Sequence, residues 1–168
     1  MTIQNTLKTD LQDVFRLYKH ATELQNQKGA VPWPTFERNL IEEEIQNRHQ
    51  WKFTTENTLA CVWSTTFEDP LIWKEKNQDP SVYIHRIATN PIYKGNNYVR
   101  KILLWAKEYA VQNNKEFIRM DTVGENLGLI NHYKNCGFQF LGLSKLEETR
   151  GLPSHYQNAT VSLFEYKI

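Results

Sequence analysis

The chain has 168 residues, a formal net charge of +1 and an apolar fraction of 40%. This length suits a single domain over residues 1–168, and it suffices to bury a core without disulfides or metals. The charge gives no bulk field for nucleic acid or for a membrane surface, and no apolar run is long enough to span a bilayer. We therefore expect a globular protein with neither kind of partner.

The N-terminus and the cysteines bear on the cellular compartment. Residues 1–5 lack the basic and apolar regions of a signal peptide. Cys61 and Cys136 lack metal-binding spacing, and the run Glu42–Glu44 is expected to be a solvated helix face rather than a metal site. Together these features predict a cytoplasmic protein with reduced thiols and no metal.

Hydrophobic periodicity and turn residues predict more strands than helices. In chain order the expected elements are a strand within 1–8, a helix after Thr9 or Asp10, a helix over 35–48, strands over 50–55 and 58–67, a loop over 68–80, a strand over 81–89, a helix over 97–113, a strand over 116–122, a helix over 126–135 and strands over 138–143 and 160–167. The pattern mixes hairpins with one strand–helix–strand crossover. It predicts an α/β (α+β) fold with a central mixed, mostly antiparallel sheet flanked by helices.

The segment from Ser81 to Ala110 carries the strongest functional signal. Its strand over 81–89 leads through a turn over 90–97 directly into a long amphipathic helix. Backbone N–H groups converge at a helix N-terminus, where the helix dipole favours negative charge. The segment therefore predicts a binding site for a phosphorylated cofactor.

Two common phosphate-binding motifs fit this segment poorly. The turn lacks the Gly-Lys-Ser/Thr sequence of a P-loop and is too short for one. A dinucleotide-binding Rossmann motif would require a second glycine at the right offset and a further strand–helix–strand repeat, and the chain has neither.

Two stretches of this region together resemble the GCN5-related N-acetyltransferase (GNAT) superfamily. Residues 87–99, Ile-Ala-Thr-Asn-Pro-Ile-Tyr-Lys-Gly-Asn-Asn-Tyr-Val, are similar to its acetyl-CoA loop, which carries an Arg/Gln-x-x-Gly-x-Gly/Ala signature. The second signature is found in Asp121-Thr122, Glu125-Asn126, Ile130, Tyr133 and Gly137-Phe138. The resemblance covers residues 81–142 and implies a GNAT-like fold for the whole chain.

The resemblance implies an acetyl-CoA site with several departures from the family signature. Lys94 stands where Arg or Gln is usual, and Asn97 and Val99 stand for small residues. The family's loop holds pyrophosphate through backbone N–H groups, and Asn tolerates positive φ, so Asn97 is expected to keep the turn. Whether the β-branched Val99 crowds the pyrophosphate is left open. The residues expected to bind acetyl-CoA are Ile87, Ala88, Thr89, Lys94, Gly95, Asn96, Asn97, Tyr98, Val99, Arg100, Asn126 and Tyr133.

Acetyl transfer to an amine requires a neutral amine, a donor to the oxyanion and an acid for the departing thiolate. The resemblance implies that Tyr133 is this acid and that the backbone N–H near Ile87 or Ala88 is the oxyanion donor. His85 is the candidate base, because it shares one strand face with Tyr83 and imidazole titrates near neutral pH. A packing role for Tyr133 and a hydrogen-bonded structural role for His85 stay open.

Neighbouring polar residues have structural interpretations. Arg86 is expected to be an ion-pair partner rather than a catalytic group. Asn126 either contacts the cofactor or caps the helix that follows it. Cys61 and Cys136 are expected to pack as small apolar side chains, and His132 to lie at the surface.

By analogy with the family, the acceptor pocket is expected from the first two helices and the loops over 68–80 and 144–159. Aromatic candidates for its wall are Trp33, Phe36, Trp73, His155 and Tyr156. The predicted function is transfer of an acetyl group from acetyl-CoA to a primary amine of a small molecule by direct transfer. A GNAT-fold CoA-binding module without catalysis and a protein N-acetyltransferase are the alternatives, and a homodimer is left open.

Overall fold

The computed structural model describes residues 2–168; Met1, within the first predicted strand, lies outside the described residues. The chain forms two compact units. Unit 1 comprises the chain up to Thr65 together with His85–Tyr98, and unit 2 comprises Thr66–Ile84 and Val99–Ile168. Each unit is thus built from segments far apart in the sequence, and the boundaries fall within secondary-structure elements.

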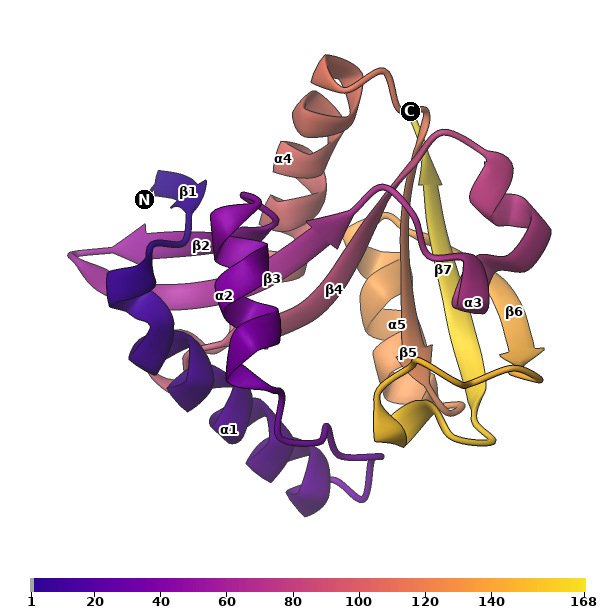
Figure 1. Cartoon of the computed structure of the whole chain (residues 1–168), viewed down its shortest axis with the longest axis horizontal. Helices are drawn as coiled ribbons and strands as arrows, with labels where there is room; N and C mark the ends of the chain where they lie inside the picture. Colours follow the sequence, from indigo (N-terminus) through magenta and orange to yellow (C-terminus); the bar gives the residue numbers. More distant parts are fainter. Residues whose placement is uncertain (1) are drawn as a thin grey trace. The chain divides into compact units, whose positions relative to one another are not determined.

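Unit 1 is a small antiparallel sheet covered by two helices (Figure 1). Its elements are β1 (Thr2–Asn5), α1 (Leu11–Gln27), α2 (Arg38–Gln46), β2 (Gln50–Thr55), most of β3 (Thr58–Thr66) and the second half of β4 (Ser81–Thr89). Strand β2 pairs with β1 on one side and with β3 on the other, both antiparallel. The β2–β3 turn places Glu56 and Asn57 at φ of 49° and 61°, as a two-residue hairpin with right-handed strand twist requires.

The core of unit 1 follows from the helical periodicity of α1. Val14 and Leu17 are fully buried on the face of α1 that meets Ile41 of α2. Leu59 and Val62 of β3 belong to the same apolar cluster. Burial of this face, rather than helix propensity alone, stabilises both helices.

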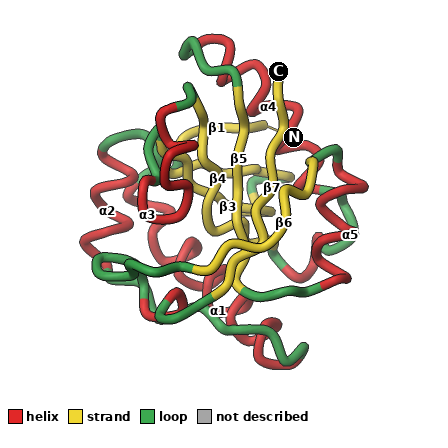
Figure 2. The backbone as a smooth tube through the Cα atoms, turned by 90° about the vertical axis from the view of Figure 1, so that its right-hand side faces the viewer, coloured by secondary structure: helices red, strands yellow, loops and turns green. Residues whose placement is uncertain are grey.

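Unit 2 is a second sheet with helices on both faces (Figure 2). Its elements are α3 (Pro70–Trp73), the first half of β4, α4 (Tyr98–Gln112, which enters from unit 1), β5 (Phe117–Val123), α5 (Leu127–Cys136), β6 (Gln139–Lys145) and β7 (Thr160–Lys167). Strand β4 runs parallel to β5, whereas β7 is antiparallel to both β5 and β6. Helix α3 lies on one side of these strands, and α4 and α5 lie on the other.

Helix α5 is bounded by the residues that the sequence marks. The Asn126 side chain accepts a hydrogen bond of 3.0 Å from the Leu129 N–H group, so it caps the helix. Gly137 ends the helix in the left-handed region at φ 115°, and a Cβ atom there would lie 3.2 Å from Leu103 Cδ2. Gly137 therefore allows both the turn and the close approach of α5 to α4.

Strand β4 has a half in each unit, and hydrogen bonds join the strands in the order β1-β2-β3-β4-β5-β7-β6. This mixed, mostly antiparallel sheet with a β4–α4–β5 crossover confirms the predicted fold class. The assignment of one domain over residues 1–168 stays a prediction.

Two local expectations differ from the structure. The predicted loop over 68–80 contains α3 and a 3-10 helix over Lys74–Gln78, because Pro70 stands at the first turn of α3 and Trp73 is buried at its end. The second predicted helix is shorter than expected and begins at Arg38. Among the described residues, no helix is long and apolar enough to cross a membrane.

Candidate active site

The loop between β4 and α4 presents backbone donors that have no partner among the described residues. Its start is fixed by Asn90, whose Nδ2 donates to the Leu59 carbonyl at 3.0 Å. The N–H groups of Gly95, Asn96 and Asn97 make no hydrogen bond with any described residue. Consecutive free N–H groups just before a helix can bind an anion such as a phosphate group.

The backbone of this loop turns at Asn97, where the family signature has a small residue. Asn97 adopts φ 53°, the left-handed conformation that Asn tolerates better than other side chains. Gly95 adopts φ 88°, and a Cβ atom there would meet nothing within 4 Å. Lys94 is exposed and Val99 is half-buried. These residues fit a pyrophosphate held by backbone donors, with a cation at the edge of the site.

Within β4, the catalytic candidate His85 has unusual electrostatics. It is half-buried, and burial together with the positive charge of Arg86 lowers the pKa of His85 to about 3. The imidazole is therefore neutral at neutral pH. It can accept a hydrogen bond from an amine, but it holds a proton only weakly. Its role as the base stays a prediction.

Arg86 forms the ion pair that the sequence predicts, and it does so from a strained position. It adopts φ 51° within β4. Its guanidinium pairs with Glu44, donates to Ser64 Oγ at 2.8 Å and lies 5.1 Å from the centre of the Phe36 ring. Tyr18 Oη accepts from Nε at 3.5 Å. The expectation of a solvated Glu42–Glu44 face is thus wrong for Glu44, because its carboxylate compensates this buried charge.

In unit 2, Tyr133 is held in place by aromatic side chains. Its ring lies 4.9 Å from that of Phe164 and 6.4 Å from that of Phe138, in edge-on contacts. The side chain is 8% exposed, and its hydroxyl makes no hydrogen bond with the residues that the structure describes. Burial, then Cys136 and Asp121, raise the pKa of Tyr133. The phenol therefore keeps its proton at neutral pH and can donate it.

Two carboxyl groups for which the sequence predicts no role, those of Asp69 and Asp121, lie close together in unit 2. Carboxylate oxygens of Asp69 and Asp121 lie within 4.8 Å of each other. Tyr156 Oη donates to Asp121 Oδ2 at 2.9 Å, whereas Asp69 Oδ2 is buried with no hydrogen-bond partner among the described residues. Burial and the charge of Asp121 raise the pKa of Asp69 to about 7, and burial raises that of Asp121 to about 6.

A sequence signal for this pair existed but was ambiguous. Asp121 belongs to the second signature and lies near the end of β5, where polar side chains often carry function. Asp69 lies just before α3, in a segment that the sequence presents as a polar loop. Their proximity depends on tertiary packing, so spacing alone could not show it.

The structure assigns the aromatic wall candidates to two different units. Trp33 and Phe36 pack against Tyr18 in unit 1, with ring centres at 5.9 Å and 5.3 Å from the tyrosine. Trp73 and Tyr156 belong to an apolar cluster of unit 2. The His155 ring lies 4.2 Å from the Tyr156 ring.

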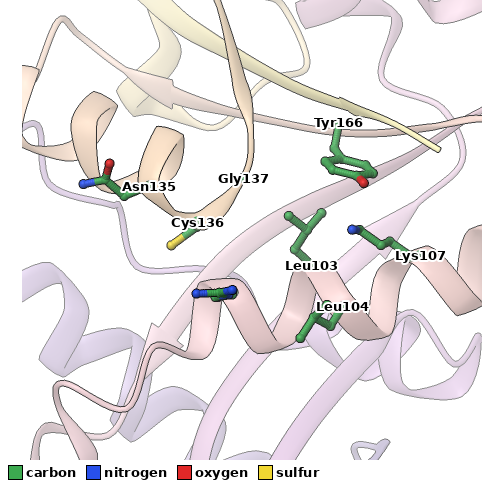
Figure 3. Close-up of a pocket in the computed structure, with 8 residues that line it drawn as sticks. Leu103, Leu104, Lys107, Asn135, Cys136, Gly137 and Tyr166 are labelled. Atoms are coloured by element: carbon green, nitrogen blue, oxygen red, sulfur yellow. The ribbon is translucent and has the colours of Figure 1, made fainter.

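A shallow hollow of about 250 Å³ lies beside α4 and α5 in unit 2 (Figure 3). Leu103 and Tyr166 face one another across it, and Lys107 lies 4.1 Å from the centre of the Tyr166 ring. Arg100, one of the predicted cofactor residues, also lines it. Cys136 is buried beside it, as expected for a small apolar side chain, and burial raises the pKa of its thiol.

Comparisons with known proteins agree with this picture. The model of the Acetyltransferase (GNAT) family matches residues 12–138. An uncharacterised N-acetyltransferase of Bacillus subtilis strain 168, YesJ, is 23% identical over 141 residues, which cover 79% of this chain and 78% of that protein.

Solved structures share the fold at low sequence identity. A GNAT-family acetyltransferase of Listeria monocytogenes superposes with a TM-score of 0.77 at 21% identity, covering 99% of this chain and 94% of that one. The acetyltransferase yncA of Salmonella typhimurium, solved with its cofactor acetyl-CoA, superposes with a TM-score of 0.70 at 14% identity, covering 99% and 93%. The family match begins well before the signature residues and extends through both units. The chain belongs to the GNAT family of acetyltransferases, which confirms the resemblance and the expected class of acyl-CoA-dependent enzyme.

Proposed function

We propose that the protein transfers the acetyl group of acetyl-CoA to a primary amine of a small molecule, in one direct step. The observation that carries this proposal is the run of free N–H groups at Gly95, Asn96 and Asn97 immediately before α4. In a protein of this family, such donors suit the pyrophosphate of the cofactor. A GNAT structure solved with acetyl-CoA supports the same cofactor here.

The remaining cofactor contacts are proposed on the same basis. Ile87 and Ala88 in the second half of β4 are the candidates to supply backbone donors to the acyl oxygen. The cap Asn126 is proposed to position the start of α5. Lys94 and Arg100 are proposed to balance phosphate charge, since both are exposed cations. When bound, acetyl-CoA supplies the activated acyl carbon.

Two side chains are proposed to donate or accept protons during the reaction. The buried phenol of Tyr133 keeps its proton at neutral pH, so we assign it to protonate the departing thiolate. The neutral imidazole of His85 is assigned to accept a hydrogen bond from the amine nitrogen and to orient its lone pair. With a lowered pKa it is better suited to relay a proton than to retain one.

Burial of the aromatic candidates supports a small acceptor rather than a protein. Trp73 is 3% exposed and packs in the same cluster as Tyr156. Side chains held in this way form a fixed wall, which suits a compact amine better than an extended peptide.

Release of the CoA thiol during incubation with acetyl-CoA and a panel of small primary amines tests this function. The wild type should release thiol only when an amine is present. Tyr133→Phe should lower kcat by about 100-fold, the lower range for loss of a general acid. Tyr109→Phe, which removes a phenol from α4, is the matched control and should keep full activity. No amine-dependent release by the wild type, despite stabilisation by acetyl-CoA, would identify a binding module instead.

A further inference from the structure

We propose that Asn90 and Tyr98 are positioning residues for the cofactor, whose side chains hold the loop between β4 and α4 in the conformation that binds pyrophosphate. The inference rests on the proposed use of acetyl-CoA. It adds to that proposal how this chain aligns the N–H groups of Gly95, Asn96 and Asn97, which have no partner among the described residues. All five residues belong to unit 1.

Asn90 joins the start of the loop to β3 through its backbone and its side chain. Its N–H group donates to the Ala60 carbonyl at 2.8 Å, and Nδ2 donates to the Leu59 carbonyl at 3.0 Å. Hydrogen bonds to the carbonyl groups of two consecutive residues fix both the position and the direction of the chain where it leaves β4. Asn90 is 8% exposed, so it acts on a ligand through the loop.

The remaining polar groups of Asn90 shape the turn that follows. Its Oδ1 accepts from the Ile92 N–H group at 3.3 Å, and its carbonyl accepts from the Tyr93 N–H group at 2.9 Å. The Pro91 carbonyl accepts from the Lys94 N–H group at 3.2 Å. The turn thus uses the N–H groups as far as Lys94, and the three that lack a partner follow directly.

Tyr98 anchors the other end of the loop among buried side chains. It is 4% exposed, and its ring centre lies 5.3 Å from that of Phe53 in β2. Within the turn, the Tyr93 hydroxyl donates to the Thr55 carbonyl of the same strand at 3.5 Å. Closely packed aromatic rings restrict the backbone that carries them. The loop is therefore attached to the β2–β3 hairpin on both sides of its three unpaired donors.

The segment between the two anchors has the backbone of an anion-binding concavity. Gly95 adopts φ 88° and Asn97 adopts φ 53°, so Asn96 lies between two residues with positive φ. An alternation of this kind brings consecutive N–H groups together around an anion. Asn96 Nδ2 also donates to the Tyr93 carbonyl at 2.8 Å, which closes the segment on itself.

The anchors matter in this chain because Asn97 stands where the family signature has a small residue. Asn is less stable than Gly in the left-handed conformation, so the surrounding contacts must hold Asn97 there. A loop that is held before the cofactor arrives loses little conformational entropy when pyrophosphate binds. Removal of an anchor should therefore weaken cofactor binding while every backbone donor is kept.

Isothermal titration calorimetry with CoA and with dephospho-CoA tests the inference. Asn90→Ala should raise the Kd of both ligands by about 10-fold, because the loop must then be ordered on binding. The two factors should be equal, since the ligands share the pyrophosphate and differ in the 3′-phosphate. Asn5→Ala removes a side-chain hydrogen bond to the Arg48 carbonyl in the same unit. This matched control should leave both Kd values unchanged.

Amide ¹⁵N relaxation gives a readout that a general loss of stability would not produce. In the free wild type, the N–H groups of Gly95, Asn96 and Asn97 should have order parameters near the rigid value of about 0.85. In Asn90→Ala they should fall below about 0.6. Tyr98→Leu, which keeps an apolar side chain, should act in the same way, and it tests the inference alone if Asn90→Ala fails to fold.

Three results would count against these assignments. Unchanged Kd values in the anchor variants, or a loop that stays rigid in them, would overturn the inference. A loss of affinity for CoA alone would place the effect at the 3′-phosphate and would also overturn it. If the wild type itself binds neither ligand, the proposed use of acetyl-CoA fails, and the inference fails with it.

Discussion

Each unit of the molecule contains a buried cluster of charged side chains, and the two clusters differ in how well their charges are balanced. In unit 1, Arg86 faces Glu44, with Ser64 and Tyr18 as further partners. In unit 2, Asp69 faces Asp121, a group of the same charge. The balanced cluster raises the pKa of Arg86, whereas the unbalanced one raises the pKa of both carboxyls. Tyr18 and Glu44 raise the pKa of Arg86 against the effect of burial. Burial is the main cause of both carboxyl shifts, and the charge of Asp121 adds to the shift of Asp69.

This difference distinguishes buried charges that stabilise the fold from buried charges that destabilise it. A buried ion pair of opposite charges fixes local geometry, here around Arg86, which has a positive φ inside β4. A like-charged pair destabilises the empty protein and is relieved only by a proton or a cation. Strain of this kind is commonly found at functional sites. We therefore expect variants of the two clusters to move stability in opposite directions.

The largest expected effect comes from breaking the balanced cluster. Arg86→Met leaves Glu44 buried without a partner and should lower the free energy of unfolding by about 3–5 kcal/mol. Urea denaturation measures the change. The double variant Arg86→Met/Glu44→Met should recover most of the loss. Arg38→Met, which breaks the exposed Arg38–Glu42 pair, is the control and should cost less than about 0.5 kcal/mol.

In the unbalanced cluster of Asp69 and Asp121, removal of one charge should raise the free energy of unfolding rather than lower it. Asp69 titrates near 3.8 when unfolded and at about 7 when folded, so between these pH values the folded state binds more protons. The stability that protonation provides is full below pH 4 and is lost as the pH rises to about 7. Asp69→Asn lacks this loss, so its free energy of unfolding above pH 7 should exceed that of the wild type by up to about 4 kcal/mol. Parallel pH-dependent curves for the two proteins would contradict this account.

The smallest expected effect tests the hydrogen bond that Tyr156 donates to Asp121. Tyr156→Phe keeps the ring but removes the 2.9 Å bond to Oδ2. Since this bond lowers the pKa of Asp121, its loss should raise that pKa further. The free energy of unfolding should fall by about 1 kcal/mol at pH 8. The cost should shrink at pH 5, where Asp121 is protonated. Urea unfolding at the two pH values measures it, and an equal cost at both would contradict the assignment.

Local sequence patterns predict most of the fold for a clear physical reason. The limits of β2 and β4 are as predicted, and Asn126 and Gly137 bound α5 as expected. These features depend on side chains near in sequence, such as caps, turns and alternating apolar residues. The sequence does not predict α3, because the helix is too short to show a helical period and burial of Trp73 stabilises it.

The sequence predicts those features of the site that depend on backbone conformation. The positive φ of Asn97 is confirmed, since residue type alone indicates it. The Glu44–Arg86 and Asp69–Asp121 contacts join segments far apart in the chain, and no spacing rule relates their members. For this reason the predicted solvated face is wrong for Glu44, and no role is predicted for Asp121.

The contrast between the two clusters is tested most directly by NMR titration of the aspartate side-chain carboxyl carbons. We expect Asp69 and Asp121 to titrate together as a coupled pair, with apparent pKa values well above 3.8. Asp79 beside Arg119 should titrate below the usual range. Titration of Asp69 and Asp121 near 3.8 would contradict the claim that this pair is buried without a balancing charge.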